Sequence, residues 1–337
     1  MTAKRLLASA ALALGLAATA AKADPVSDFY AGKNLTIVIG YSVGGGYDLY
    51  ARLLARFMGP NMAGAPTMIP QNMPGAGSLK SAMYLAQVAP KDGTVVATFG
   101  RSIVLEPLFS GAKFDPRKFS WLGSITKDSS LCVSWAASPI KTWDDLMTKG
   151  ARMGGQAAGS DPDVYAQILK TLFGSNLKLV TGYPGNNEMA LALERGELDG
   201  FCGLSWSSLQ SRHRDWITDH KINILVKASA GGDDEIQAPQ MIDKLTDPQK
   251  KAALGLILST QAMARPYAAP PGVSAERLAA LRAAFRKTID SPEFRAEADK
   301  LGLDVAPVSG EEVEKRLAEI YAQPPEVVAL AKQAVGQ

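Results

Sequence analysis

Three consecutive glycines followed by a tyrosine and an aspartate, Gly44–Asp48, form the stretch of this sequence best suited to binding an anion. Glycine has no Cβ, so the backbone can adopt positive φ and a ligand can approach the main-chain N–H groups closely. The apolar spacing that follows predicts a helix over 48–58, and the first N–H groups of a helix lack intrahelical partners and attract negative charge. The stretch is therefore predicted to cradle an anion; the alternative is a glycine turn that only shapes the fold.

The residues around these glycines exclude two common nucleotide-binding loops. A Walker loop ends in Gly-Lys-Ser/Thr, whereas Gly46 is followed by Tyr47. A dinucleotide fingerprint that begins at Gly44 requires a glycine where Leu49 stands, and an acidic residue about twenty positions later. The stretch 66–72 contains no aspartate or glutamate. We expect no cofactor.

Two further loops precede predicted helices over 163–173 and 187–195. In the first loop, Ser160 can cap the helix, and the free N–H groups would form a second anion cradle that faces the first. An ordinary capped helix without a ligand is the alternative. In the second loop, Gly185 and Asn186 suit hydrogen bonding to a carboxylate or hydroxyl, although Pro-Gly-Asn is also typical of a plain turn.

Arg101 is the most notable side chain outside these loops. It follows a predicted buried strand over 94–99, and a guanidinium suits bidentate binding of a carboxylate. The structural alternative pairs it with Glu106 or a neighbouring acid, and we favour this interpretation. Trp206 either walls a cleft or fills the core, and we expect it in the core.

The inventory of reactive residues argues against an enzyme. The stretch Gly203–Ser208 looks like a serine-hydrolase elbow, but Ser207 stands where the second glycine is required. His213 and His220 are the only histidines, lack the carboxylate pattern of a zinc protease, and are expected at the surface. We therefore predict neither a catalytic residue nor a metal site.

Hydrophobic periodicity predicts the elements that position these loops. Strand-like runs occupy 35–39, 67–71, 94–99, 131–135, 178–181, 198–202 and 222–226. Helical spacing occupies 48–58, 78–88, 142–149, 163–173, 187–195, 205–219, 275–289 and 309–321. This alternation is typical of an α/β protein with mostly parallel sheets covered by helices on both faces. The chain length favours two domains.

Residues 1–23 have the pattern of a cleavable export signal, with two basic residues, an apolar run over 6–20 and a small-x-small end at Ala21–Ala23. We expect cleavage after Ala23 and a soluble periplasmic protein. The full chain has 36 Lys and Arg against 33 Asp and Glu, and three of the basic residues lie in this segment, so the remainder is balanced. The balance does not favour nucleic-acid binding.

Six short motifs follow one another along the chain. They are Gly44–Asp48 with Ala51 and Arg52, Gln71–Gly77, Ala89–Gly93, Ser138–Leu146, Tyr183–Gly185 and Ala269–Val273. In this order they resemble the tripartite tricarboxylate transporter receptors, extracytoplasmic solute-binding proteins also called Bug proteins. The resemblance covers nearly all of the chain after residue 23, and the ordered set is specific although each motif alone is weak.

The resemblance implies a two-lobed periplasmic-binding-protein fold of type II-like architecture. Lobe 1 would comprise 25–126 and 228–337, and lobe 2 would comprise 127–227. The ligand would lie in the cleft between the lobes, in the manner of a Venus flytrap. Cys132 and Cys202, the only cysteines, would both lie in lobe 2. They either form one disulfide or remain two buried thiols.

The resemblance also implies that one ligand carboxylate is held by main-chain groups and ordered waters at the glycine loop, while lobe 2 binds the far end. The ligand-binding residues expected from it are Tyr41, Ser42, Gly45, Gly46, Tyr47, Asp48, Gly159 and Ser160. Arg101, Gly185 and Asn186 complete the candidate set. Asp48 is expected to order the loop, because like charges repel. Tyr47 replaces a small residue or threonine of the family, and would narrow the pocket or stack on an aromatic ligand.

The function that the resemblance implies is capture of a small organic carboxylate, aliphatic or aromatic, for delivery to the membrane permease of a tripartite tricarboxylate transporter. We expect a monomer. An exported enzyme that acts on such an acid is one alternative. A receptor that presents its ligand to a signalling partner is another.

Overall fold

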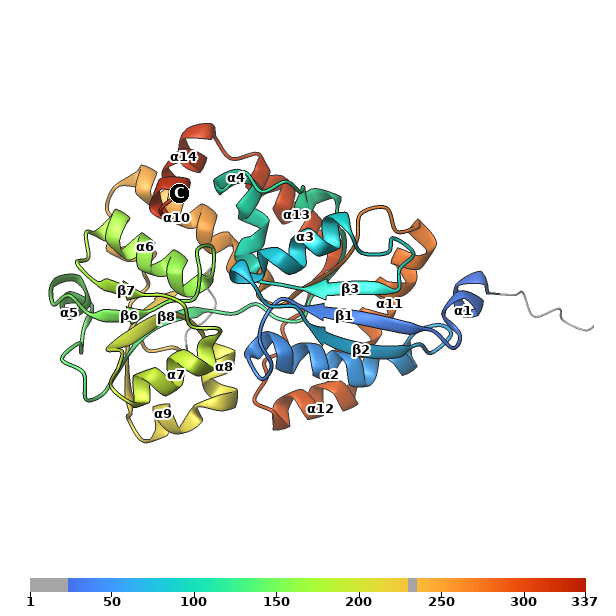
Figure 1. The fold of residues 1–337 in the computed structure, drawn as a ribbon, viewed down its shortest axis with the longest axis horizontal. Helices are drawn as coiled ribbons and strands as arrows, with labels where there is room; N and C mark the ends of the chain where they lie inside the picture. The colour runs from blue at the N-terminus through green and yellow to red at the C-terminus, as the bar shows by residue number, and fades with distance from the viewer. Residues whose placement is uncertain (1–23, 230–234) are drawn as a thin grey trace, which may run out of the picture.

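The structure, a computed structural model, describes residues 24–229 and 235–337. Two β-sheets flanked by helices form two lobes that lie side by side (Figure 1). The predicted export signal lies outside the described residues. Among the helices within these ranges, none combines the length and the apolar composition that crossing a membrane requires.

The sheet of lobe 1 has six strands in the order β11-β4-β10-β3-β1-β2. The inner strand β1 is parallel to both of its neighbours, whereas β10 is antiparallel to both of its own. Residues Ile37 to Ile39 are almost fully buried, as the unbroken apolar run of this strand predicted. The strands are β1 Asn34–Ile39, β2 Thr67–Asn72, β3 Val95–Thr98, β4 Ser120–Ser124, β10 Pro266–Ala269 and β11 Val308–Ser309.

The sheet of lobe 2 has five strands in the order β7-β6-β8-β5-β9. Here β6 is parallel to β7 and β8, while β5 is antiparallel to β8 and β9. The strands are β5 Ser130–Trp135, β6 Arg152–Gly154, β7 Lys178–Val180, β8 Gly200–Ser205 and β9 Ile222–Ala228. The lobe boundaries given above stay a prediction.

Both sheets are thus mixed: within the predicted α/β architecture, each sheet combines parallel pairs of strands with antiparallel ones. A parallel connection requires a crossover that returns the chain to the same end of the sheet. The strands β5 and β10 are the first strands that the chain enters after passing from one lobe to the other. Each therefore starts at the edge where the lobes meet and runs away from it, opposite to the neighbouring strands that end there.

Helices cover the sheets, and the last of them lies away from the sheet of lobe 1. Helix α14 packs on α10 and α6, next to the sheet of lobe 2 (Figure 1), although the expected division places 228–337 in lobe 1. The helices of the first half are α1 Pro25–Tyr30, α2 Gly46–Asn61, α3 Leu79–Gln87, α4 Glu106–Phe109, α5 Trp143–Thr148 and α6 Asp161–Phe173. Those of the second half are α7 Asn186–Glu194, α8 Trp206–Arg212, α9 Arg214–Thr218, α10 Pro248–Leu258, α11 Ala275–Asp290, α12 Pro292–Lys300, α13 Gly310–Tyr321 and α14 Pro325–Ala334.

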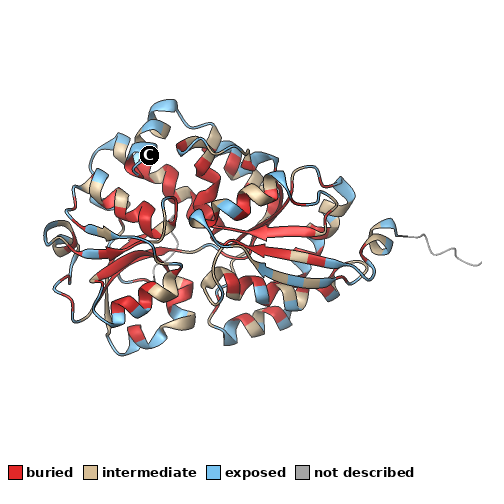
Figure 2. Cartoon of the chain, in the orientation of Figure 1, coloured by how far each residue is buried: buried red, intermediate tan, exposed pale blue. Residues whose placement is uncertain are grey.

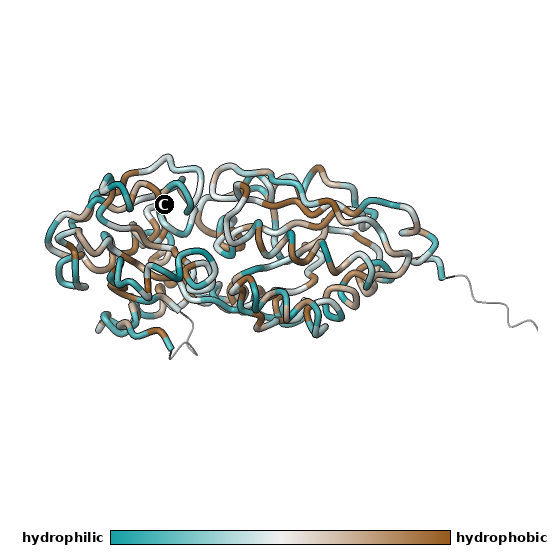
Figure 3. The backbone as a smooth tube through the Cα atoms, turned by 90° about the horizontal axis from the view of Figure 1, so that it is seen from below, coloured by the Kyte–Doolittle hydropathy of each residue, from teal (hydrophilic) through white to brown (hydrophobic). Residues whose placement is uncertain are grey.

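Buried residues follow the strands and the helix faces that cover them (Figure 2), and the strands are the most apolar part of the backbone trace (Figure 3). One apolar cluster is continuous between the lobes: it contains Phe99 and Trp121 of lobe 1 together with Met153 and Leu169 of lobe 2. Trp206 is partly buried and packs against a separate cluster within lobe 2, so it lies at the margin of the core and does not line the cleft. The lobes are therefore joined by a shared core on one side.

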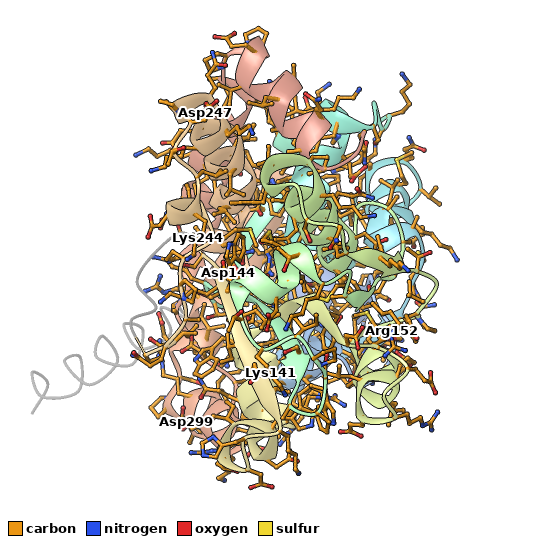
Figure 4. The ribbon with its side chains drawn as sticks, turned by 90° about the vertical axis from the view of Figure 1, so that its left-hand side faces the viewer. Lys141, Asp144, Arg152, Lys244, Asp247 and Asp299 are labelled. Carbon is orange, nitrogen blue, oxygen red and sulfur yellow. A yellow bond between two sulfur atoms is a disulfide. The ribbon has the colours of Figure 1, made fainter. Side chains whose placement is uncertain are left out.

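The end of lobe 2 that faces away from lobe 1 carries charges of both signs. Lys141, Asp144 and Arg152 are interspersed on this face (Figure 4). Arg152 forms an ion pair with Asp199. This face therefore carries no cluster of a single sign among the labelled residues.

Cys132 of β5 and Cys202 of β8 form a disulfide between neighbouring strands of lobe 2. The sequence left open whether these cysteines form a disulfide or remain two buried thiols, and the structure contains the disulfide. The bridge closes a loop with a sequence separation of 70 residues. A loop of this length restricts the unfolded chain strongly.

We expect the double variant Cys132→Ala/Cys202→Ala to lose about 4 kcal/mol of unfolding free energy, the value that the chain-entropy model gives for a loop of this length. Urea denaturation of the native and variant proteins measures the difference. Native protein treated with a thiol reductant serves as the control, because it should lose a similar amount without any substitution. Equal stability of all three samples contradicts the prediction.

Candidate ligand-binding cleft

A cleft lies between the lobes, where loops after β1, β6, β7 and β8 converge. It encloses about 680 Å³ of space not occupied by atoms, part of it open to solvent. Seven of the expected ligand-binding residues line it: Tyr41, Ser42, Gly45, Gly46, Tyr47, Gly185 and Asn186.

The glycine loop presents the amino end of the long helix α2 to this cleft. Gly44 has a φ of 83°, which favours glycine, whereas Gly45 has an extended backbone and directly precedes the helix. No side chain caps the first turn at Gly45. The loop therefore has the uncapped N–H groups that the sequence predicted for an anion cradle.

Asp48 is buried beneath this loop and does not line the cleft. Its carboxylate accepts hydrogen bonds from the Gly44 N–H at 2.8 Å, from Arg52 Nε at 2.9 Å and from Asn72 Nδ2 at 2.9 Å. Burial alone would raise the pKa of Asp48, but these hydrogen bonds outweigh it and hold the pKa below its ordinary value of 3.8. These contacts order the loop, as expected for this residue.

Tyr47 is enclosed by the protein's own groups. Its ring stacks on Tyr41 at 4.6 Å between centroids, and the guanidinium of Arg265 lies 4.6 Å from its centroid. Its hydroxyl accepts a hydrogen bond from the Arg101 N–H at 3.2 Å. Tyr47 therefore narrows the cleft, and Tyr41 and Arg265 occupy the positions where an aromatic ligand would stack.

Arg212, at the end of α8, faces the glycine loop from lobe 2. A Cβ built on Gly44 would lie 3.6 Å from Arg212 NH1 and 3.5 Å from Asn187 Nδ2. Arg212 lines the cleft, and its Nε is buried without a hydrogen-bond partner. Among residues 24–229 and 235–337, no acid forms an ion pair with it. A positive charge therefore lies unpaired opposite the amino end of α2.

Comparison with known proteins places this fold and cleft in a family. The model of the tripartite tricarboxylate transporter family receptor matches residues 51–329. The chain belongs to this family. The match confirms the resemblance stated from the sequence.

Several relatives of this receptor are known. A UPF0065 protein from the gbd 5' region of Cupriavidus necator is 25% identical over 309 residues, which cover 88% of this chain and 86% of that protein. The periplasmic binding protein BugD has a TM-score of 0.72 at 18% identity, covering 90% of this chain and 98% of that one. MatC from Rhodopseudomonas palustris, solved with bound malate, has a TM-score of 0.67 at 19% identity, covering 90% and 99%. These structures share the two-lobed periplasmic-binding-protein fold.

Besides Asp48, three candidate residues of this receptor lie outside the cleft lining, namely Arg101, Gly159 and Ser160. Arg101 is buried and forms an ion pair with Asp161. The favoured prediction, that Arg101 pairs with an acid of the protein, is therefore confirmed, but the acid is not Glu106. The Ser160 hydroxyl donates to Asp163, which also accepts the Gln156 N–H. The Asp163 carboxylate thus binds groups of the loop, no side chain caps the start of α6, and the two residues expected to form the second cradle, Gly159 and Ser160, do not line the cleft.

Sequence reasoning missed Arg212 and Arg265, and placed His213 wrongly at the surface. His213 lines the cleft, is half-buried, and stacks on Trp216 at 4.1 Å between centroids. Burial and the neighbouring charge of Arg212 lower the pKa of His213, so the ring is neutral at pH 7. His220 is exposed, as predicted. The break between α8 and α9 at His213 turns Arg212 toward the cleft, and no motif in the sequence marks it.

We expect Asp48→Asn to lower the unfolding free energy of this receptor by about 1 to 3 kcal/mol at neutral pH, because it removes charge-assisted hydrogen bonds. The folded-state pKa of Asp48 is depressed, so its stabilisation is present above the ordinary value of 3.8 and is lost as pH falls through the folded-state pKa. Urea unfolding of native protein and variant should therefore differ at neutral pH and converge in acid. A difference that is the same at every pH contradicts this role.

Proposed function

We propose that this chain is an exported receptor that captures a small organic carboxylate and delivers it to the membrane permease of a tripartite tricarboxylate transporter. The observation that carries the proposal is the unpaired Arg212 guanidinium, which faces the uncapped amino end of α2 across the cleft. A carboxylate between them would accept hydrogen bonds from both lobes. Relatives solved with malate and with adipate support this ligand class.

Closure of the lobes would supply the binding energy. In this closed arrangement the lobes approach so closely that a Cβ on Gly185 would lie 2.8 Å from Ser42 Oγ, and one on Gly46 would lie 2.5 Å from Ser208 Oγ. The buried ion pair of Arg101 with Asp161 also links the two lobes. A bound carboxylate would replace water at Arg212 and the glycine loop, and so favour this closed state over an open one.

A thermal-shift screen of residues 24–337 against aliphatic and aromatic mono-, di- and tricarboxylates tests the proposal. A ligand that binds only the folded state stabilises it by about 2.7 kcal/mol at a hundredfold excess over Kd. A saturable rise in melting temperature with at least one class, and recovery of the ligand unchanged, is the expected result. A chemically altered ligand would support the enzyme alternative instead. No shift with any carboxylate at millimolar concentration overturns the proposal.

Binding alone does not separate delivery to a permease from presentation to a signalling partner. We expect cells that lack the permease subunits to lose uptake of the ligand while the purified receptor still binds it. Uptake that persists without the permease favours the signalling alternative. Amino-terminal sequencing of the exported protein tests the predicted cleavage after Ala23.

A further inference from the structure

We propose that the cleft selects an acid with a single carboxylate whose far end carries a hydrogen-bond donor, a hydroxyl or an ammonium, in preference to a dicarboxylate. This inference rests on the proposed function and names the substrate class within it. It follows from the charges that line the two sides of the cleft.

One unpaired positive charge faces the cleft. The guanidinium of Arg265 is buried and pairs with Asp128 at 3.1 Å. Arg101 is likewise buried and pairs with Asp161. Each of these two cations is therefore offset by an acid of the protein, and Arg212 alone remains for a ligand anion among the described arginines at the cleft. One cation suits one carboxylate.

The amino ends of the lobe 2 helices near the cleft are already supplied with carboxylates. Asp163 accepts hydrogen bonds from the Gln156 N–H and the Ser160 hydroxyl at α6. Asp128 accepts the N–H and the hydroxyl of Ser207 at α8. Glu188 lies in the first turn of α7. Asp163 and Glu188 form no ion pair in the described part of the chain, whereas Asp48 in the first turn of α2 is paired with Arg52, so the starts of α6 and α7 attract a second anion less than the start of α2 does.

Besides the unpaired Arg212, lobe 2 has carboxylate oxygens without a partner at or near the cleft. Asp161 lines the cleft, and only its Oδ2 is bonded, to Arg101; Oδ1 has no hydrogen-bond partner in the described part of the chain. Glu188 Oε2, beside Gly185, is buried without a partner. A ligand hydroxyl or ammonium would satisfy such oxygens, whereas a second carboxylate would be repelled by them.

Asp161 faces the cleft, unlike Asp48, the acid below the glycine loop. Asp48 is turned away from the cleft, and three donors hold its carboxylate. Asp161 has 15% of its side chain exposed and faces the ligand space. Lobe 2 therefore presents both the unpaired Arg212 and the carboxylate of Asp161 to the cleft, while the glycine loop of lobe 1 presents main-chain donors. A molecule with one anionic end and one donor end matches this polarity.

Matched ligand sets test the proposal on the native protein by isothermal titration calorimetry at one ionic strength. The aliphatic set is butanoate, 4-hydroxybutanoate, 4-aminobutanoate and succinate, repeated with three- and five-carbon chains. The aromatic set is 4-methylbenzoate, 4-hydroxybenzoate, 4-aminomethylbenzoate and terephthalate. At the best-binding length, we expect the hydroxyl or ammonium member to bind at least tenfold more tightly than the dicarboxylate. Comparison of the hydroxyl member with the ammonium member of each set shows which of the two donors the cleft prefers.

The outcomes separate this proposal from the proposed function. A dicarboxylate that binds as tightly as the donor member, or a methyl end that binds as tightly, overturns the selectivity and leaves the carboxylate receptor intact. Absence of binding by every acid overturns the receptor proposal itself.

Substitution of Asp161 tests the residue that carries the argument. We expect Asp161→Asn to reduce the ratio of the two affinities at least tenfold, and an unchanged ratio contradicts the assignment. Because this change leaves Arg101 buried without its partner, the single variant can fail to fold. The double variant Arg101→Gln/Asp161→Asn then gives the same test, since no unpaired buried charge remains.

Discussion

Replacing Arg212 by glutamine is expected to weaken carboxylate binding about 10- to 100-fold, because a hydrogen bond to a charged group contributes about 1.5 to 3 kcal/mol. No acid in the described part of the chain pairs with Arg212, so the substitution leaves no buried carboxylate without a partner. The unfolding free energy of the ligand-free protein should therefore change little. Isothermal titration calorimetry and urea denaturation measure the two quantities.

Two further variants define what Arg212 contributes. Arg212→Lys keeps the charge but loses the planar fork of donors, so its affinity should lie between those of the native protein and of Arg212→Gln. Arg214 is exposed and lies two residues away on α9, so Arg214→Gln makes the same change in net charge outside the cleft. If Arg214→Gln weakens binding as much as Arg212→Gln, the loss of affinity arises from the change in net charge and not from a contact between Arg212 and the ligand in the cleft.

The glycine loop could be predicted because its determinants are local. An unbroken apolar run gave β1, and helical spacing gave α2. The role of Asp48 also follows locally, since Arg52 is one helical turn away and forms an ion pair with it.

The missed parts of the cleft depend on tertiary structure. Arg212 ends a short helix without any recognisable motif, and only the turn at His213 directs it to Gly44.

Two features of the sheets also depend on tertiary structure. Strand β4, Ser120–Ser124, contains two serines and a glycine that rarely favour strands, yet all five residues are buried between β10 and β11. The direction of β5 depends on which lobe the chain arrives from, and no local pattern records that.

Gly46→Ala is expected to weaken ligand binding about 10- to 100-fold without removing any donor or charge. The new Cβ would lie 2.5 Å from Ser208 Oγ and 3.2 Å from Arg265 NH2 in the closed structure. Relieving overlap of this kind costs about 1 to 3 kcal/mol. Most of the cost falls on the closed state, because the nearer residue, Ser208, belongs to the opposite lobe, whereas Arg265 directly precedes β10 of lobe 1. The isolated helix should not suffer, since alanine is the stronger helix former.

Two variants make this prediction specific to closure. Gly255→Ala is the matched control, because Gly255 lies within helix α10 outside the cleft lining and the nearest atom to its Cβ would be Ile242 Cδ1 at 4.0 Å. Adding Ser208→Ala to Gly46→Ala removes the hydroxyl and leaves the serine Cβ position at 3.8 Å, an ordinary contact. We expect Gly255→Ala to bind normally and the double variant to recover most of the lost affinity. Small-angle scattering with saturating ligand should show Gly46→Ala more extended than both. If the double variant binds as weakly as Gly46→Ala, the loss arises in the glycine loop itself and not from the approach of the two lobes.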